Sequence, residues 1–369
     1  MSTAGTNRQT AIGRWAGLGP YYAMFPIDFA FNVIEQYSSL GDAVLDPFAG
    51  RASSVYAAAA LGRSSCGIEI NPVGWLYGRV KLKPATKPSV LRRIREIGEI
   101  AKAVSKEVIE ELPEFFSFCY SSEVLRYLIA ARNTLCWKTS IVDGTLMAII
   151  LVNLHGKRQS SLSNQMRQGK AMSPDYSVRW WKSHNLLPPE IDPITFLMKK
   201  VDWRYGKGTP YPLNGNVIFG DSMTSINRIH KNVIKGKQKP FDLLFTSPPY
   251  HSITNYHKDQ WLRLWMLGSY DHPTILKGKW QKRFDSKSEY RDLLQTVFKN
   301  CAKVMSPDAV IYIRTDVREF TYQTTLDALT CAFPHKEVTT LVQPFTKMTQ
   351  TALFGDKTQK PGEIDIILR

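Results

Sequence analysis

The stretch from Phe241 to Tyr250 constrains the fold of this chain more than any other part of the sequence. A largely apolar run, Phe241–Phe245, ends abruptly at Thr246-Ser247-Pro248-Pro249-Tyr250. Such a run is typical of a buried strand of a parallel sheet, because helices cover both faces of that sheet. The two prolines end the strand, since each fixes φ and lacks a backbone N–H. The stretch therefore predicts an α/β sheet with a ligand site at the carboxyl end of this strand, where ligands bind in open α/β sheets.

The residues after this strand suit an amino group on a flat ring. Ser247 offers a hydroxyl oxygen and Pro248 a free carbonyl, and both can accept the protons of an exocyclic amine. Tyr250 offers an aromatic face on which a planar base can stack. A purely structural Pro-Pro turn is the alternative, but its position after a buried strand disfavours it. The chemistry that this group of residues indicates is methyl transfer to a nucleobase amine.

A second unit of the same type lies near the amino terminus. A short strand at Val44–Asp46 runs into the turn Asp46-Pro47-Phe48-Ala49-Gly50, an Ala-rich helix is predicted over Ser53–Leu61, and Ser65–Ile70 is the next strand. A strand, a helix and a parallel strand in this order imply a right-handed crossover. Gly50 allows a ligand to approach the backbone closely at the turn.

Three acidic residues end successive predicted strands. Asp46 can receive a cationic amine. Glu69 follows the turn by about 20 residues, which is the usual position of an acid that binds ribose. Asp221 can accept a hydrogen bond from an adenine amino group. S-adenosylmethionine carries an ammonium, a ribose and an adenine. For each acid taken alone, a helix cap or turn residue is the favoured explanation, and the ordered set of three weakens that explanation. A dinucleotide is the competing ligand, but the chain has no Gly-x-Gly-x-x-Gly turn to cradle a pyrophosphate.

These motifs together resemble those of the amino-group DNA methyltransferases, which modify cytosine N4 or adenine N6. The family's cofactor motif Asp-Pro-Phe-x-Gly matches residues 46–50, its acidic motif matches 67–72, and Thr-Ser-Pro-Pro-Tyr matches 246–250. Its aromatic-Pro segment is similar to residues 21–26. Ala52 departs from the pattern, because many members carry a second glycine there. The resemblance covers only short, scattered pieces of the chain.

The resemblance implies a Rossmann-like class I methyltransferase fold, with a mostly parallel sheet that ends in an antiparallel hairpin and with a helical and irregular insertion. It implies S-adenosylmethionine as cofactor and the catalytic residues Ser247, Pro248, Pro249 and Tyr250. The predicted cofactor-binding residues are Tyr22, Phe25, Pro26, Asp46, Pro47, Phe48, Gly50, Glu69, Ile70, Asp221 and Thr246. Serine at 247, where many adenine enzymes carry Asp or Asn, favours cytosine N4 and leaves adenine N6 open. An RNA base-amine methyltransferase and a DNA-binding protein without activity are further alternatives.

The remaining strands and the insertion complete the predicted organisation. Strands are expected at Asn216–Phe219, Ala309–Ile313, Val338–Val342 and Ile364–Leu368. Helical spacing predicts helices over Ser89–Leu112, Glu123–Leu135 and Gly144–Leu154, whereas 157–211 is polar, basic and aromatic without clear periodicity. The catalytic core is therefore assigned to 1–75 and 213–369, and the inserted helical and target-recognition region to 76–212.

Charge and composition indicate a polyanionic partner. The chain has 48 Lys and Arg against 32 Asp and Glu, a net charge of +16. Such an excess favours nucleic acid, because neutralised phosphates release counterions. Arg, Asn and Gln read base edges, so the predicted DNA-binding residues are Lys157, Arg158, Gln159, Ser163, Asn164, Gln165, Arg167, Lys170 and Lys258. An ordinary solvated loop is the alternative for any one of them.

The expected partner is double-stranded DNA, and a cognate restriction endonuclease of the same system is left open. The five cysteines are scattered and odd in number, which predicts a reducing compartment and no thiolate zinc site. We expect no metal and no membrane segment, since the longest apolar run, Leu146–Leu154, is too short to span a bilayer. The predicted location is the cytoplasm of a bacterial-type cell, on the nucleoid when DNA is bound.

Overall fold

The computed structural model describes residues 7–20, 26–210, 212–252, 256–274, 286–343 and 362–369, and within them the chain forms one seven-stranded sheet of order β3-β2-β1-β4-β5-β7-β6. The strands from β1 to β5 pair in parallel, and β7 is antiparallel to both β5 and β6. Their bounds are β1 Ala43–Asp46, β2 Ser64–Glu69, β3 Gly215–Phe219, β4 Phe241–Thr246, β5 Met305–Asp316, β6 Val338–Gln343 and β7 Glu363–Leu368.

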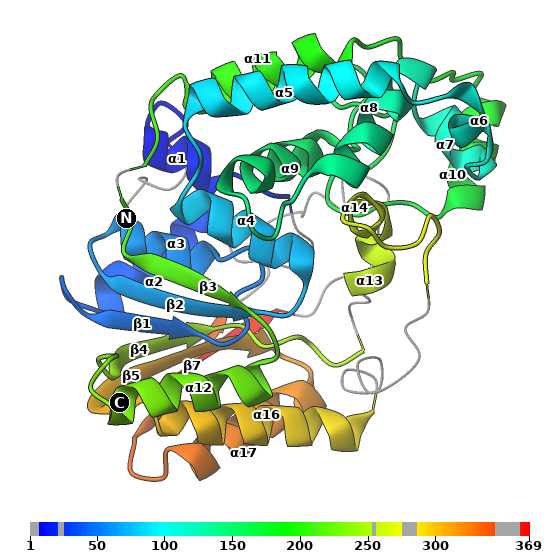
Figure 1. The fold of residues 1–369 in the computed structure, drawn as a ribbon. Helices are drawn as coiled ribbons and strands as arrows, with labels where there is room; N and C mark the ends of the chain where they lie inside the picture. The colour runs from blue at the N-terminus through cyan, green and yellow to red at the C-terminus, as the bar shows by residue number, and fades with distance from the viewer. Residues whose placement is uncertain (1–6, 21–25, 211, 253–255, 275–285, 344–361) are drawn as a thin grey trace.

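Helices cover both faces of this sheet, as Figure 1 shows. One face carries α2 (Ile27–Tyr37), α3 (Ser53–Ala60) and α4 (Pro72–Leu82), and the other carries α12 (Ser222–Ile234), α16 (Lys287–Ala302) and α17 (Glu319–Ala332). This strand order with its terminal antiparallel hairpin is the Rossmann-like class I methyltransferase fold, so the predicted fold class is confirmed.

The central strands are apolar on both sides because the sheet lies between two cores. Val44 and Leu243, which are register partners in β1 and β4, belong to the core on the side of α3 and α4. The next partners, Leu45 and Leu244, belong to the core on the side of α12 and α16. Successive residues of a strand point to opposite faces, so a continuous apolar run fits only a strand that is covered twice.

The segment between β2 and β3 builds a helical layer above the sheet (Figure 1). Its helices after α4 are α5 (Lys87–Lys102), α6 (Lys106–Glu110), α7 (Glu114–Cys119), α8 (Ser122–Thr134), α9 (Ile141–Asn153), α10 (Pro174–Ser183) and α11 (Pro193–Tyr205). Three short helices from elsewhere, α1 (Ala11–Ala16), α13 (Tyr256–Asp259) and α14 (Trp261–Met266), lie against this layer. Its apolar core is continuous with that on the α3 and α4 face of the sheet.

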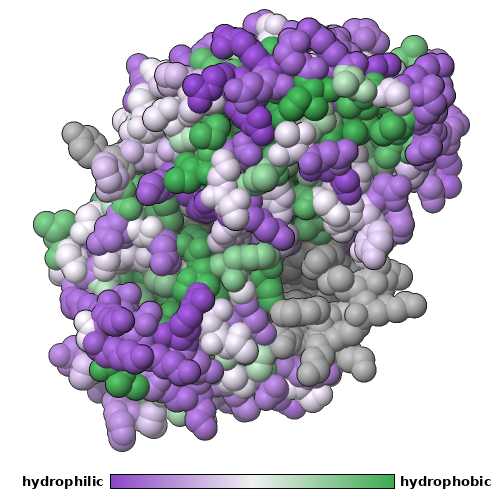
Figure 2. Space-filling view, in the orientation of Figure 1, coloured by the Kyte–Doolittle hydropathy of each residue, from purple (hydrophilic) through white to green (hydrophobic). Residues whose placement is uncertain are grey.

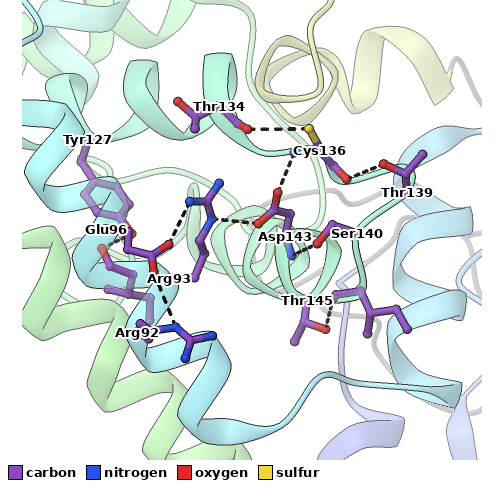
Figure 3. Close-up of polar contacts among 12 residues, drawn as sticks. Arg92, Arg93, Glu96, Tyr127, Thr134, Cys136, Thr139, Ser140, Asp143 and Thr145 are labelled. Carbon is purple, nitrogen blue, oxygen red and sulfur yellow. Dashed lines mark hydrogen bonds and ion pairs between the residues drawn. The ribbon is translucent and has the colours of Figure 1, made fainter.

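Helix α9 is the centre of this layer and is buried on all sides from Asp143 to Asn153. Asp143 joins three parts of the layer, as Figure 3 shows: its Oδ1 accepts from Arg93 Nε of α5 at 2.8 Å, and its Oδ2 accepts from the backbone N of Cys136 at 2.9 Å. Ser140 caps the same helix by accepting from the N–H of Asp143. A buried carboxylate is thus satisfied by an arginine and a backbone amide, as burial of charge requires.

Three details differ from the sequence-based expectation. The helix predicted over Ser89–Leu112 is broken, because Arg126 donates to the carbonyl of Val104 at 2.5 Å and Ser105 begins a new helix. Two helices, α10 and α11, lie in the part predicted to be irregular, and each begins with a proline at its first turn. The predicted boundary at residue 76 falls inside α4, which packs against β2 and β3.

Figure 2 shows how residue types are distributed on one face of the molecule. Hydrophilic residues gather over α5 and α11 and again over α12, and hydrophobic residues are visible between these two regions. Within the part of the chain that the structure describes, no helix is both long and apolar enough to cross a membrane.

Candidate active site at the carboxyl edge

The two motifs that are farthest apart in the sequence meet at the carboxyl edge of the sheet. Strands β1 and β4 are neighbours, so Asp46 and Thr246, their last residues, lie side by side. The Thr246 hydroxyl donates to Asp46 Oδ1 at 2.5 Å. This bond links the turn at 46–50 to the Pro-Pro motif that follows Thr246.

Asp46 is fully buried and both of its carboxylate oxygens accept hydrogen bonds. Oδ1 also accepts from the backbone N of Phe48 at 3.0 Å, and Oδ2 accepts from the Ser54 hydroxyl at the start of α3. Burial raises the pKa of Asp46 to about 6, although these hydrogen bonds lower it. The side chain therefore fixes the turn between β1 and α3, and its predicted contact with a cofactor amine stays a prediction.

Glu69 and two glycines shape the next part of this edge. Glu69 Oε2 accepts from Gly50 N and Oε1 from Asn71 N, both at 2.6 Å, so that the end of β2 supports the turn after β1. Gly50 has a φ of +54°, which glycine adopts without strain. A Cβ on Gly74 of α4 would lie 2.6 Å from the Gly50 carbonyl oxygen. The helix, the turn and the acid are therefore in close contact only because residue 74 is glycine.

Burial gives Glu69 an unusual charge behaviour. Desolvation raises the pKa of its carboxyl to about 8, while the bonds from Asn71 and Gly50 lower it. A carboxyl with this pKa is mostly protonated at pH 7, and a ligand that donates hydrogen bonds to the ionised form would shift it toward ionisation.

Two apolar side chains stand exposed where β2 and β3 end. Ile70 is 39% exposed and Phe219 is 45% exposed, and their strands are paired in parallel up to Glu69 and Phe219. Asp221 follows and caps α12 by accepting from Met223 N at 3.1 Å. An exposed aromatic ring at a ligand-binding sheet edge suits a flat adenine. Sequence reasoning missed Phe219, although its place at the end of a predicted strand, directly before Gly220-Asp221, was a usable signal.

The remaining predicted cofactor residues lie around this edge or outside the described residues. Pro47 is buried and its carbonyl accepts from the Ser222 hydroxyl, while Phe48 is half-buried against the core near α12. Pro26 is exposed at the start of α2. Tyr22 and Phe25 lie outside the described residues. The buried acids, the open glycine turn and the exposed apolar pair fit S-adenosylmethionine, since they match its polar sugar and its apolar base.

The Pro-Pro motif carries a short chain of hydroxyl groups. Ser247 Oγ donates to Tyr250 Oη at 3.4 Å, and Tyr250 Oη donates to Glu363 Oε1 at 3.3 Å. Pro248 is buried, whereas Ser247, Pro249 and Tyr250 are half-buried. Burial raises the pKa of Tyr250 well above 10, so its ring carries a neutral phenol. Because the Ser247 proton points to Tyr250, the lone pairs of Ser247 are free to accept from another donor.

Glu363 is a second residue that sequence reasoning missed. It is the first residue of β7 and pairs in register with Asp316, the last residue of β5, so the antiparallel strand begins at the same edge where the parallel strands end. Burial raises its pKa, and Arg314 at 3.3 Å lowers it. The acid in Gly362-Glu363-Ile364 was visible in the sequence, but its position depends on the antiparallel pairing.

The predicted DNA-binding residues divide into exposed and buried groups. Lys157, Gln159, Arg167, Lys170 and Lys258 are exposed, and Arg158 and Gln165 are half-buried. Ser163 and Asn164 are fully buried, which corrects the expectation that they face DNA. Asn164 Nδ2 donates to the carbonyls of Phe118 and Leu186, and its Oδ1 accepts from Gln165 N. These two polar side chains build the loop and do not present groups to a ligand.

Arg263, in helix α14, is another polar residue of this region that is buried. Its guanidinium donates to Leu151 O at 3.0 Å, to Gln168 O at 2.6 Å and to Gln260 Oε1 at 2.6 Å. It therefore holds α14 against α9 and against the loop 157–170. Lys170 pairs with the buried Asp259 at 2.7 Å and ties the same loop to the segment that follows the Pro-Pro motif.

No group of three or more His, Cys, Asp or Glu that could hold a metal ion occurs among the residues that the structure describes.

Comparisons with known proteins agree with the motifs. Residues 3–73 match the family of DNA methylases that comprises N6- and N4-methyltransferases. The chain is also similar to the Type II methyltransferase M.MthZI of Methanothermobacter thermautotrophicus, with 45% identity over 49 residues. That stretch covers 13% of this chain and 14% of the relative's length.

Solved structures with some similarity to this chain include two methyltransferases. The rRNA methyltransferase aviRa of Streptomyces viridochromogenes has 10% identity and a TM-score of 0.36, with coverage of 99% of this chain and 92% of that one. A SAM-dependent methyltransferase from Agrobacterium tumefaciens has 10% identity and a TM-score of 0.35, with coverage of 93% and 60%. The matched residues 3–73 contain the turn 46–50 and the strand that ends at Glu69, which meet Thr246–Tyr250 at one sheet edge. The match over residues 3–73 and the short stretch shared with a Type II methyltransferase therefore support an amino-group DNA methyltransferase family for this chain.

Proposed function

We propose that this protein transfers a methyl group from S-adenosylmethionine to the exocyclic amine of a base in DNA, at cytosine N4. One observation carries the proposal: the Thr246 hydroxyl donates to Asp46 at 2.5 Å, so the cofactor turn and the Pro-Pro motif, about 200 positions apart, form one edge. A cofactor on the first motif and an amine on the second would then be adjacent. When bound, S-adenosylmethionine supplies an electrophilic methyl group.

The side chains of the motif would bind and orient the amine. We infer that the base is extruded from the duplex, because its amine is otherwise held inside the stack. Ser247 Oγ and the Pro248 carbonyl accept the two amine protons, and this turns the nitrogen lone pair toward the cofactor edge. Tyr250 supplies the ring on which the base stacks. Positioning of this kind would account for much of the catalysis. The nitrogen would take the methyl group as its bond to sulfur breaks, and the cationic amine that results is acidic enough to lose its proton to solvent without a strong base.

The choice of base rests on residue 247. Serine has one acceptor hydroxyl, whereas many adenine enzymes of the family carry Asp or Asn at this position. Cytosine N4 is therefore the proposed target, and adenine N6 is the alternative that the experiment below decides.

The layer above the sheet would then supply target recognition. We propose that residues 76–212 contact the DNA around the target base, and that 1–75 and 213–369 carry the chemistry. The exposed Lys157, Gln159 and Arg167 are among the residues of the loop 157–170 that could reach base edges or phosphates.

Nucleoside mass spectrometry tests the proposal directly. DNA is digested from cells that express the chain and from cells that express a Ser247→Ala, Tyr250→Ala variant. A new N4-methylcytosine signal that is absent from the variant is the expected result. N6-methyladenine would keep the mechanism and overturn the choice of base. Unmodified DNA in the presence of soluble protein would contradict the proposal.

A single substitution separates the role of Ser247 from a structural effect. Ser247→Ala is expected to lower turnover by about 100-fold or more while the affinity for S-adenosylmethionine stays within about twofold, because Ser247 faces the amine and not the cofactor. Isothermal titration of the cofactor measures the second quantity. Equal losses of turnover and of cofactor affinity would contradict the role assigned to Ser247.

A further inference from the structure

A large cavity lies between the helical layer and the amino-terminal segment. Its volume is about 1110 Å³, and its walls come from α1, the start of α2, Arg51 just before α3, α9, α11 and the loop 157–170. Figure 1 shows that α1 lies near one end of α11, and residues of both helices line the cavity. Of the nine residues predicted to bind DNA, Gln159 is the one that lines this cavity.

The walls of this cavity are strongly cationic. Six basic residues line it, and we call this group the cationic cleft: Arg8, Arg14, Arg51, Lys199, Lys200 and Arg204. Asp192 is the acid among the described residues of the lining, and its oxygens accept from Ile194 N and Thr195 N at the start of α11. That carboxylate is therefore committed to the helix cap, and the cations face a cavity that contains little opposing charge.

Two of the six guanidinium groups are almost fully buried. Arg51 is 7% and Arg204 is 8% exposed, and their hydrogen bonds within the described residues go to a serine and to carbonyls, not to carboxylates. The ammonium of Lys81, which is completely buried, donates to the carbonyl of Arg51 at 2.7 Å. Burial lowers the pKa of Arg51 to about 10, and burial together with the neighbouring Arg8 lowers that of Arg204 to about 10 as well.

The cationic cleft lowers the stability of the protein when no ligand is bound. Burying a cation without an anion costs free energy, and like charges near one another add to the cost. A ligand with several negative charges would offset both contributions. Arginine predominates, and its planar fork matches phosphate oxygens, whereas lysine acts as a point charge.

The position of the cleft matches the path of a nucleic-acid strand. One end is at Arg51, directly after the turn 46–50, and at Pro20 and Ile27 near the sheet edge. The other end reaches Gln159 and Gln168, which are exposed on the loop 157–170. A strand that lies in the cleft therefore passes from the proposed catalytic edge to the proposed recognition loop.

We propose that the cationic cleft holds the phosphate backbone of the DNA substrate next to the base that is modified. This inference rests on the proposed function for the identity of the substrate. It places the main phosphate contacts on α1, on Arg51 and on α11.

Arg8 and Lys199 allow a test that leaves the fold intact. Both are exposed, and neither side chain has a hydrogen bond or ion pair to another described residue. The test variant is Arg8→Gln, Lys199→Gln. The control is Lys235→Gln, Lys237→Gln, which removes two exposed cations just after α12, at the opposite edge of the sheet.

Fluorescence anisotropy with labelled duplex DNA, at several salt concentrations, measures both affinity and the number of phosphates contacted. The cleft variant is expected to bind about tenfold more weakly near 0.1 M salt, and the slope of log K against log salt concentration should be smaller by about 2, since each phosphate contributes about 0.9. The control should match the wild type, and both variants should bind S-adenosylmethionine normally.

The outcomes separate this inference from the proposed function. DNA methylation by the wild type, with unchanged affinity and slope in the cleft variant, would overturn the cleft and leave the function standing. Weakened duplex binding in the cleft variant, with no methylated base formed by the wild type, would support the cleft and contradict the function. Binding of an RNA hairpin but not of duplex DNA would overturn the assignment of the cleft to DNA.

Discussion

Arg314 and Asp365, which are register partners across β5 and β7, form a bidentate ion pair inside the sheet. Arg314 Nε and a terminal nitrogen donate to the two oxygens of Asp365 at 2.6 and 2.7 Å. The guanidinium also lies 3.4 Å from the centre of the Phe29 ring and 3.3 Å from Glu363. The pair thus connects α2, the antiparallel hairpin and the acid that accepts from Tyr250.

Removing one charge of this pair should destabilise the protein strongly. Asp365→Asn leaves a buried guanidinium opposite a neutral amide, and breaking a buried pair typically costs about 3–5 kcal/mol. The midpoint of urea unfolding should fall accordingly. The double variant Arg314→Met, Asp365→Leu should lose much less, because it leaves no uncompensated charge. A single variant as stable as the wild type would contradict this account.

Gly74 offers a test of how the cofactor turn is packed. A Cβ in Gly74→Ala would lie 2.6 Å from the Gly50 carbonyl oxygen and 3.1 Å from Glu69 Cγ, so the turn or the helix must move. We expect the affinity for S-adenosylmethionine to fall by about tenfold or more, measured by isothermal titration.

Gly98→Ala is the matched control. It lies inside α5, and its Cβ would meet mainly the flexible end of the Ile194 side chain. Alanine favours a helix over glycine by about 1 kcal/mol, so this variant should be as stable as the wild type or more stable, with unchanged cofactor affinity. Equal effects of both substitutions would argue against a specific role for Gly74.

Much of the sheet and of its edge followed from local patterns. Apolar runs that end in Asp46, Glu69 and Thr246 predict buried parallel strands, and parallel strands necessarily bring their carboxyl ends together. The closing strands were predicted as well, within a few residues for β6 and β7, although β5 extends further at both ends than its apolar centre.

What the sequence could not show is which polar side chains are buried. Asn164 looks like a base-reading residue, yet it is enclosed by the carbonyls of Phe118 and Leu186, which are distant in the chain. Arg51, Lys81 and Arg204 likewise look like surface cations, and only the tertiary packing encloses them. The helices α10 and α11 were missed despite Ser173-Pro174 and Asp192-Pro193, which are ordinary helix starts.

The raised pKa of Glu69 predicts how stability and binding depend on pH. Its pKa rises from 4.5 to about 8 on folding, so between these values the folded protein binds more protons than the unfolded chain. The contribution of Glu69 to stability therefore falls as pH rises from 4.5 to 8. If the ionised carboxylate accepts from the ribose, cofactor affinity should instead rise toward pH 8, by at most tenfold per pH unit.

Calorimetry can detect the proton itself. At pH 7 the binding enthalpy of S-adenosylmethionine should differ between phosphate and Tris buffers, because the released proton is taken up by the buffer. Glu69→Gln should remove this difference, and Glu99→Gln, at an exposed position of α5, should keep it. A buffer-independent enthalpy in the wild type would show that Glu69 does not change its protonation on binding.

Lys81 should have the opposite dependence on pH. Burial, together with Arg51 and Arg204, lowers its pKa well below 10.5. Up to pH 10.5 the unfolded chain therefore binds more protons at this residue, so its contribution to stability improves as pH rises toward that value.

Lys81→Met removes a buried cation, and at pH 7 it should raise the free energy of unfolding by about 1–3 kcal/mol. The gain should shrink toward pH 10 in urea titrations, whereas Lys83→Met, at the exposed end of the same helix, should have little effect at any pH. A loss of stability in Lys81→Met at all pH values would mean that its bond to the Arg51 carbonyl outweighs the cost of the buried charge.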